Sequence, residues 1–235
     1  MHRLGVLSVA GATRGAPVTA TAYVNALPRV SVVILSHRFD MATEAKRSIR
    51  AQSYPDIEIL WKYHPEYWPT KFNEAWAGAS GKYLVFLPDD DTLEPEFVAR
   101  HVAEAERAAA DLVFSDFYVT GKLRLKWHLP AFDAEILRVH CVPFMTFLVR
   151  TEFWRNLPNG THGERGGWDG TLAYSDWDAG IRMYQAHAKA VHLRGEFLWN
   201  RAEHAKAGSR LMDDAAHAAA LRALRDKHSA MAQPG

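Results

Sequence analysis

Short apolar segments that alternate with helix-forming stretches are the feature that most constrains the fold of this 235-residue chain. Residues 30–35 are β-branched and almost wholly apolar, and residues 57–63 and 83–87 form similar runs. Runs of this kind suit strands that are covered on both faces of a sheet. A fourth strand is predicted to begin at Leu112.

Helix signals fill the gaps between these strands. Asp40 offers an N-cap for a helix that reaches Gln52, and residues 70–79 form a second helix. Pro95 suits the first turn of a third helix, which continues through Ala110. This order predicts an α/β fold with a mostly parallel central sheet flanked by helices, of the Rossmann-like kind. Ligands bind such sheets beyond the carboxyl ends of the strands.

The second half of the chain is less regular and is predicted to form a smaller subregion of the fold. Residues 122–127 alternate basic and apolar side chains, which predicts a half-exposed strand. Residues 159–171 contain five glycines and predict a loop. A helix over 176–187, a strand over 190–199 and an alanine-rich helix over 213–228 complete the pattern.

Composition narrows the possible function classes. The formal net charge of +1 gives no global field that would hold nucleic acid or an anionic membrane. The single cysteine, Cys141, excludes an intrachain disulfide and cysteine-based zinc sites, and it fits a cytoplasmic protein. No apolar run approaches the roughly 20 residues of a transmembrane helix.

We predict three regions: a flexible or loosely packed leader at residues 1–28, a single globular domain at 29–210 and a helical tail at 211–235. The leader faintly resembles a signal peptide, but its apolar stretch is short and is diluted by Gly5 and Ser8. The tail helix is open to packing on the sheet, to homodimer formation or to membrane contact. The last is disfavoured because the tail lacks a basic face and bulky apolar residues.

Three consecutive aspartates, Asp89, Asp90 and Asp91, follow the predicted strand 83–87. Carboxylates this close repel one another, and a hard divalent cation such as Mn²⁺ or Mg²⁺ would relieve the repulsion and bridge to substrate phosphates. The alternative is a solvated acidic turn that caps the following helix. From these residues alone, both interpretations stay open.

The approach to this cluster resembles family 2 glycosyltransferases of the GT-A fold. Residues 30–38, VSVVILSHR, look like the opening strand and nucleotide loop of the family, and residues 73–91, NEAWAGASGKYLVFLPDDD, are similar to the stretch that leads into its DXD motif. The resemblance is clear over residues 29–115 and patchier to residue 210. It implies a metal-dependent, inverting enzyme that moves a sugar from a nucleotide-sugar, a UDP-sugar by default, to an acceptor hydroxyl.

The resemblance also implies roles for the three aspartates. Asp91 is the principal metal ligand, Asp89 binds the metal or the donor ribose, and Asp90 belongs to the donor site without a settled role. Members of the family carry an acidic residue at or just after the second strand that reads the base. Residues 61–66 contain no aspartate here, so the identity of the nucleotide is left open.

A second acidic site, Ser175-Asp176-Trp177-Asp178, resembles the acidic pair at a helix start where one carboxylate of the family acts as general base. Asp176 matches best, although Ser175 stands where the family usually has a glutamate. An inverting transfer needs a base to take the proton of the acceptor hydroxyl. The alternative is structural, with Asp176 as a helix cap and Asp178 paired with Arg182.

Other residues are candidates near the donor, most of them by resemblance and Trp168 from its place in the glycine-rich loop. The candidates for donor binding are His37, Arg38, Lys71, Asn73, Trp168, Arg201 and Arg210, and His204 is a third candidate metal ligand beside Asp89 and Asp91. Trp168 is assigned to stacking on a sugar ring. Lys71 and Asn73 fit an ordinary amphipathic helix equally well, and lone histidines such as His204 are usually structural or solvated.

Two rival functions and the acceptor stay open at this point. A nucleotidyltransferase is disfavoured because residues 36–40 lack the glycine of a phosphate loop, and a non-catalytic nucleotide-sugar-binding module is disfavoured by the two acidic sites. A retaining mechanism would need no base on the acceptor side. The acceptor is a glycan, a lipid-linked sugar, a small molecule or nucleic acid. Lys122, Arg124 and Lys126 form either a surface for an anionic acceptor or a solvated strand face.

Overall fold

The structure is a computed structural model that describes residues 27–36, 42–63, 69–158, 166–203 and 213–229. The strands are β1 (Val30–Ser36), β2 (Ile57–Tyr63), β3 (Tyr83–Pro88), β4 (Thr92–Leu93), β5 (Leu112–Thr120), β6 (Arg124–Trp127), β7 (Leu148–Arg150) and β8 (Ala190–Ala202). The helices are α1 (Ala42–Arg50), α2 (Pro69–Trp76), α3 (Phe97–Ala108), α4 (Ala134–Leu137), α5 (Thr151–Asn156), α6 (Ser175–Gln185) and α7 (Asp214–Lys227).

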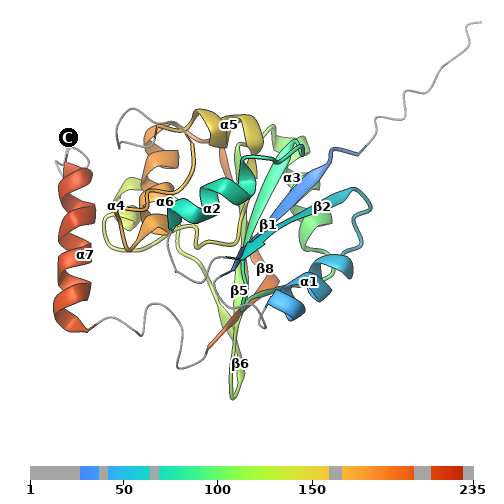
Figure 1. The fold of residues 1–235 in the computed structure, drawn as a ribbon, viewed down its shortest axis with the longest axis horizontal. Helices are drawn as coiled ribbons and strands as arrows, with labels where there is room; N and C mark the ends of the chain where they lie inside the picture. The colour runs from blue at the N-terminus through green and yellow to red at the C-terminus, as the bar shows by residue number, and fades with distance from the viewer. Residues whose placement is uncertain (1–26, 37–41, 64–68, 159–165, 204–212, 230–235) are drawn as a thin grey trace, which may run out of the picture.

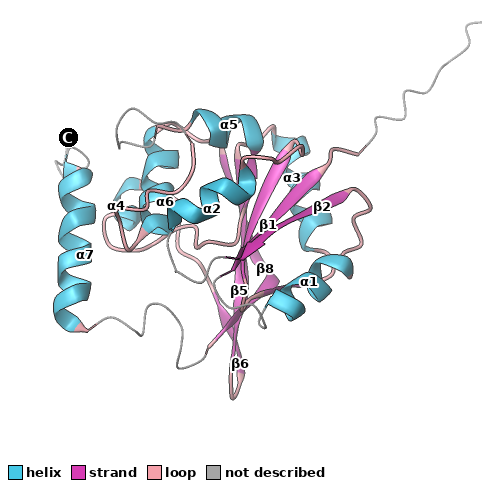
Figure 2. Cartoon of the chain, in the orientation of Figure 1, coloured by secondary structure: helices cyan, strands magenta, loops and turns pink. Residues whose placement is uncertain are grey.

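A single twisted sheet forms the centre of the molecule, with helices packed around it (Figures 1 and 2). Its strand order is β2-β1-β3-β7-β5-β8-β4, and β6 pairs with β5 off this path. Strand β1 lies between β2 and β3 and is parallel to both, and β5 is parallel to β8. β7 runs antiparallel to both β3 and β5, so β5 points in the same direction as β3. The predicted α/β fold with a mostly parallel sheet is confirmed.

The burial of the first strands explains why they could be predicted from the sequence. All seven residues of β1 are buried, and so are the first five of β3, because helices cover both faces of the sheet there. Strands in that position need continuous apolar runs rather than alternation. The observed bounds of β2 are those predicted, and the helices expected after β1, β2 and β3 are present as α1, α2 and α3.

Three elements between β6 and α6 were not anticipated, namely the one-turn helix α4, the strand β7 and the helix α5. The apolar run before Arg150 contains β7, a three-residue strand inserted between β3 and β5. It is followed at once by the short helix α5. Such a short antiparallel strand has no sequence pattern of its own, since its pairing partners lie far away in the chain.

The predicted half-exposed strand at residues 122–127 is a projecting hairpin instead. Strands β5 and β6 form a hairpin ribbon whose turn projects from the sheet (Figure 1), and β8 pairs with the other side of β5 as far as Thr120. All four residues of β6 are exposed, so the apolar side of the alternating pattern is not covered. The expectation of one buried face was wrong, because the side chains on both faces of β6 are exposed, although Arg124 contacts Glu94 and Asn200.

A buried carboxylate fixes the junction of β5 and β8. Asp116 is fully buried and accepts hydrogen bonds from the backbone N–H groups of Leu129 and Gly195 and contacts the rings of His128 and His192 at 2.8 and 2.7 Å. Burial alone would raise the pKa of Asp116, but these hydrogen bonds outweigh it and the pKa is lowered. The register between the strands shifts at this residue, so Asp116 ties an irregular part of the sheet together.

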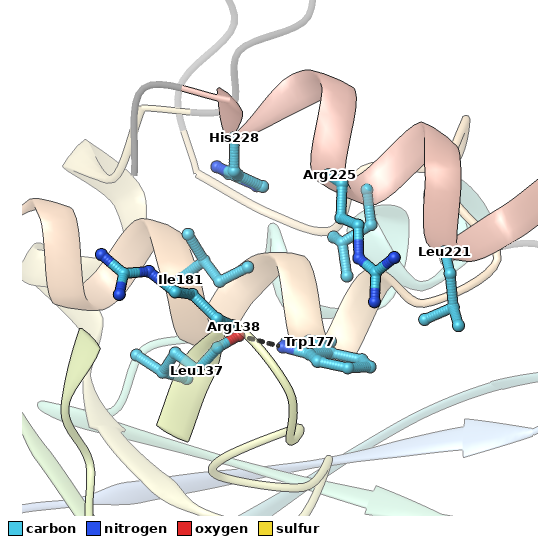
Figure 3. Close-up of a pocket in the computed structure, with 8 residues that line it drawn as sticks. Leu137, Arg138, Trp177, Ile181, Leu221, Arg225 and His228 are labelled. Carbon is cyan, nitrogen blue, oxygen red and sulfur yellow. Dashed lines mark hydrogen bonds between the residues drawn. The ribbon is translucent and has the colours of Figure 1, made fainter. Parts of the chain in front are cut away.

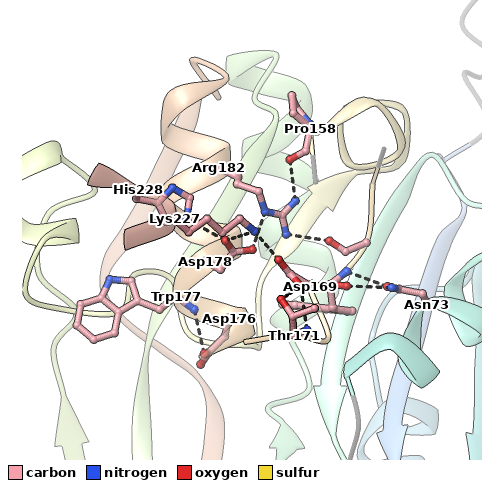
Figure 4. Close-up of polar contacts among 12 residues, drawn as sticks. Asn73, Pro158, Asp169, Thr171, Asp176, Trp177, Asp178, Arg182, Lys227 and His228 are labelled. Carbon is pink, nitrogen blue, oxygen red and sulfur yellow. Dashed lines mark hydrogen bonds and ion pairs between the residues drawn. The ribbon is translucent and has the colours of Figure 1, made fainter. Parts of the chain in front are cut away.

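The tail helix α7 packs against α6 through charged side chains (Figure 4). Lys227 lies 2.7 Å from Asp178 and 2.6 Å from Asp169, and His228 lies 2.8 Å from Asp178. The tail was open to packing on the sheet, to dimer formation or to membrane contact, and these contacts place its end on helix α6. Within the described part of the chain, no helix is long and apolar enough to cross a membrane.

An apolar pocket lies between α7, α6 and the segment around α4 (Figure 3). Its volume is about 170 Å³, and the lining residues are Leu137, Arg138, Trp177, Ile181, Leu221, Leu224, Arg225 and His228. The indole N–H of Trp177 donates to the carbonyl oxygen of Leu137 across its floor. The pocket therefore borders the same helical turn that carries Asp176.

Candidate functional site

The acidic cluster lies where the carboxyl ends of several strands meet. Asp89 follows β3 directly, and its backbone N–H donates to the carbonyl oxygen of Leu35 near the end of β1. Asp89 and Asp91 are only 1% and 5% exposed. Asp91 is joined to the end of β8, because its Oδ1 accepts a hydrogen bond of 3.0 Å from the backbone N–H of Ala202.

The charge of Asp91 is poorly compensated by its surroundings. Burial raises the pKa of Asp91 well above its ordinary value, and the neighbouring charges of Asp90 and Asp89 raise it further. The hydrogen bond from Ala202 and the positive charge of Arg201 act in the opposite direction but do not cancel these effects. A nearby cation would therefore stabilise the ionised form of this carboxylate.

The second acidic site, at the start of α6, faces the same region. Asp176 lies in the first turn of α6, where its Oδ1 accepts a hydrogen bond of 2.9 Å from the backbone N–H of Trp177. Burial raises its pKa, while this hydrogen bond, a hydrogen bond with the thiol of Cys141 and the charge of Arg201 lower it in part. The N-cap of α6 is Tyr174, so Asp176 is not the capping residue.

Arg201, near the end of β8, connects the two acidic sites. Its positive charge acts on the carboxylates of both Asp91 and Asp176. The guanidinium carbon lies 5.1 Å from the ring centre of Phe144, which is within the range of a cation–π contact. An anion that binds beside these carboxylates would therefore meet the positive charge of Arg201.

The residues present fit a hard divalent cation. Carboxylate oxygens are the ligands that Mg²⁺ and Mn²⁺ prefer, and the uncompensated charge of Asp91 beside Asp89 and Asp90 suits such an ion. Among the described residues, however, no group of three or more histidine, cysteine, aspartate or glutamate side chains is arranged to hold a metal. Substrate oxygens and water would have to complete the coordination of any ion bound here.

Two of the predicted donor-binding residues have structural roles. Trp168 is 0% exposed and packs against Phe86 and Trp154, with ring centres 4.9 and 5.0 Å apart. Its predicted stacking on a sugar is wrong, because the ring is part of the core. Asn73 holds this segment in place, since its side chain bonds to the backbone N–H and carbonyl of Trp168 at 2.8 and 3.0 Å.

Several predicted site residues lie outside the described residues. They are His37, Arg38, His204 and Arg210, together with the side chain of Lys71, whose backbone belongs to α2. Their roles stay predictions. Of the remaining candidates, Asp89, Asp91, Asp176 and Arg201 are brought to one edge of the sheet, and Asp90 lies between the first two.

Cys141 and the packing of α7 were not found in the sequence. The thiol of Cys141 contacts Asp176, and the pKa of the thiol is raised well above its ordinary value by burial and by the charge of Asp176. No local pattern marks this contact, because 35 residues separate the two positions. The predicted pair of Asp178 and Arg182 is confirmed at 2.7 Å, but its extension to Lys227 and His228 was not foreseen.

We expect Gly180→Ala to disturb the site because α6 and the Cys141 segment are in backbone contact. A Cβ atom at Gly180 would lie 2.3 Å from the carbonyl oxygen of Val142. The two segments must then separate, which should lower the free energy of unfolding by about 1–3 kcal/mol and reduce activity. Chemical denaturation measures the first effect. Gly78→Ala is the control, since its Cβ would meet no atom within 4 Å; equal losses in both variants would contradict the account.

Comparisons with known proteins place the chain in a family. The family described as Glycosyl transferase family 2 matches residues 40–168. Among solved structures, residues 1–349 of S. aureus TarS in complex with UDP-GlcNAc align with a TM-score of 0.60 and 12% identity, covering 75% of this chain and 59% of that one. The same TarS fragment in complex with UDP aligns with a TM-score of 0.58 and 14% identity, covering 76% and 61%. A search of curated proteins gave no match.

These likenesses carry different weights. At such low identity the TarS structures establish the fold, which is the GT-A fold, and this chain spans about three-fifths of the length of that TarS fragment. The family match covers more than half of the chain and includes the acidic cluster Asp89–Asp91. The chain therefore belongs to glycosyl transferase family 2.

Proposed function

We propose that this protein is a metal-dependent, inverting glycosyltransferase that moves a sugar from a nucleotide-sugar to an acceptor hydroxyl. The observation that carries the proposal is the position of Arg201, whose charge acts on both the acidic cluster and Asp176. A diphosphate bound beside Arg201 and the acidic cluster would leave its sugar near the carboxylate of Asp176. Family membership and the nucleotide-bound TarS structures support a nucleotide-sugar as donor, with UDP as the first choice.

The proposed roles follow from this arrangement. Asp176 accepts the proton of the acceptor hydroxyl while the oxygen of that hydroxyl bonds to the anomeric carbon of the sugar. The bond from the anomeric carbon to the nucleoside diphosphate breaks in the same step. Arg201 stabilises the negative charge that develops on the leaving diphosphate. Asp91 and Asp89 would hold a divalent cation, which when bound supplies further positive charge to that leaving group. Asp90 lines the donor site beside them.

A panel of nucleotide-sugars tests the proposal by thermal shift, with and without Mn²⁺. Binding to the folded protein raises its melting temperature by mass action. We expect one nucleotide class to raise it only when Mn²⁺ is present. The anomeric configuration of the product, read by NMR, then distinguishes inversion from retention. The proposal fails if no nucleotide-sugar shifts the melting temperature under either condition.

The pH dependence of turnover follows from the position of Asp176. The base acts only when ionised, and burial raises its pKa above the ordinary aspartate value of 3.8. We therefore expect kcat/KM to fall with decreasing pH, with the midpoint above that value. Arg201→Gln removes a charge that favours the ionised form, so the midpoint should move to higher pH. An unchanged midpoint in this variant would show that the charge of Arg201 does not influence the pKa of the base.

A further inference from the structure

The β5–β6 hairpin, residues 117–127, carries three exposed apolar side chains. Leu123, Leu125 and Trp127 are 70%, 53% and 51% exposed. They are three of the six large apolar side chains exposed in the described part of the chain. Because side chains alternate along a strand, these three share one face, which we call the hairpin apolar face.

The basic side chains of the hairpin lie on the opposite face, where two of them contact the body of the protein. Arg124 forms an ion pair of 2.6 Å with Glu94 and lies 3.5 Å from the ring centre of Tyr118. Lys126 lies 4.9 Å from the ring centre of Phe197. The usual arrangement of an edge strand is thus inverted, since charged groups contact protein and apolar groups face solvent. An inverted strand of this kind needs an apolar partner.

The hairpin apolar face continues toward the candidate active site. Trp127 is paired with Phe117 in the ribbon, and Phe117 stacks on Trp199 with ring centres 4.4 Å apart. In the neighbouring strand, Arg201 is in register with Val119, which is paired with Leu125. Paired residues of adjacent strands project from the same side of a sheet. The exposed apolar side chains and Arg201 therefore lie on one side of the sheet.

The geometry points to a lipid bilayer as the partner of the hairpin apolar face, and to a lipid-linked acceptor for the reaction. The face is too small for a stable protein interface, which takes about 20–30 residues on each side. A bilayer surface needs only a few tryptophan and leucine side chains to enter, with lysines beside the headgroups. Lys122 and Lys126 are exposed and alternate with this face along the same hairpin, so their long side chains can reach anionic headgroups when the hairpin enters the bilayer surface. The acceptor class rests on the proposed glycosyl transfer, because a bilayer at this face adjoins the side of the sheet that carries Arg201.

Vesicle sedimentation of the full chain tests the inference. We expect binding to vesicles of phosphatidylcholine mixed with phosphatidylglycerol and weaker binding to phosphatidylcholine alone. Leu125→Ser should lower the partition coefficient by about tenfold, since one large apolar side chain leaves the lipid. Leu27→Ser is the matched control, because Leu27 is also 53% exposed but precedes the amino end of β1, whereas the hairpin lies at the carboxyl end of the parallel strand β5. The inference is overturned if the protein does not sediment with either vesicle or if both variants bind equally.

Two further readouts separate the alternatives. Brominated lipids should quench part of the tryptophan fluorescence, and Trp127→Phe should remove that part. If sedimentation velocity instead shows a dimer that Leu125→Ser dissociates, the partner is a second copy and the bilayer is wrong. Donor binding by the same variants tests the proposed function separately: Leu125→Ser should bind nucleotide-sugar as the unmodified protein does. Vesicle binding without any donor binding would refute the glycosyl transfer and leave the membrane contact standing.

Discussion

Asp176→Asn is expected to lower kcat by about 10²- to 10⁴-fold, the range that a positioned general base contributes. Asparagine keeps the size of the side chain and an oxygen that accepts the hydrogen bond from the Trp177 N–H, so the start of α6 should stay folded. It cannot accept the proton of an acceptor hydroxyl at neutral pH. Initial rates at saturating donor, followed by release of the nucleoside diphosphate, measure the effect.

The control for this variant must change an aspartate without touching the site. Asp226→Asn serves, since Asp226 is exposed on α7. Donor affinity should be nearly equal in the unmodified protein and in both variants, because Asp176 acts on the acceptor. If Asp176→Asn keeps more than about a tenth of the activity, a loss far smaller than a base provides, the proton is taken by another group or the mechanism is retaining.

Asp178→Ala is expected to lower the free energy of unfolding by about 3–5 kcal/mol, the usual loss when one member of a buried ion pair is removed. Asp178 is fully buried, and Arg182, its partner at 2.7 Å, is only 4% exposed. Lys227 and His228 of the tail also lose their contact with this carboxylate. Denaturation by urea, followed by circular dichroism, measures the loss, and Asp214→Ala on the exposed side of α7 is the control.

The same carboxylate gives stability a predictable acid dependence. Burial would raise the pKa of Asp178, but the hydrogen bond of His228 and the charges of Arg182 and Lys227 outweigh it and lower the pKa to about 2. The folded state thus binds this proton less readily than the unfolded state, whose aspartate has a pKa of 3.8. The contribution is complete above pH 3.8 and is lost as the pH falls toward 2. As the pH falls through this interval, the free energy of unfolding should therefore decrease less in Asp178→Ala than in the unmodified protein.

The parts of the fold that the sequence predicted well are those in which burial is uniform. Strands β1, β2 and β3 lie side by side, and the continuous apolar runs of β1 and β3 reflect helices on both faces of the sheet. Tail helix α7 was equally clear, since Asp213 caps it through the backbone N–H of Ala216. β7 was invisible because its three residues gain their conformation from pairing with β3 and β5.

The two incorrect interpretations had a common physical cause. Trp168 follows a glycine-rich segment and was assigned to a ligand, but the glycines let the chain turn so that the ring enters the core. The alternating pattern of β6 was assigned one buried face, but the side chains on both faces of this strand are exposed. Local patterns report which side chains share a face. They do not report whether tertiary structure covers that face.

The candidate site was predictable only where it is local in sequence. The acidic cluster is a run of three residues after a strand, and Asp176 and Asp178 start a helix. Arg201 and Cys141 lie beside these carboxylates only because β8 and the segment before β7 meet the same edge of the sheet. Contacts of that kind depend on the topology, so the sequence suggested Arg201 by resemblance and gave no sign of Cys141.

The dependence of donor binding on the acidic cluster tests the central proposal most directly. Isothermal titration of a UDP-sugar, with and without Mn²⁺, should be made on the unmodified protein and on Asp91→Asn. Asparagine keeps an oxygen for the Ala202 N–H but removes the charge. We predict that Mn²⁺ tightens donor binding by about tenfold or more, as expected when a cation bridges carboxylates and phosphates, and that Asp91→Asn abolishes this effect. Equal donor affinity with and without Mn²⁺, or an unchanged response in Asp91→Asn, would contradict a metal-dependent donor site at this cluster.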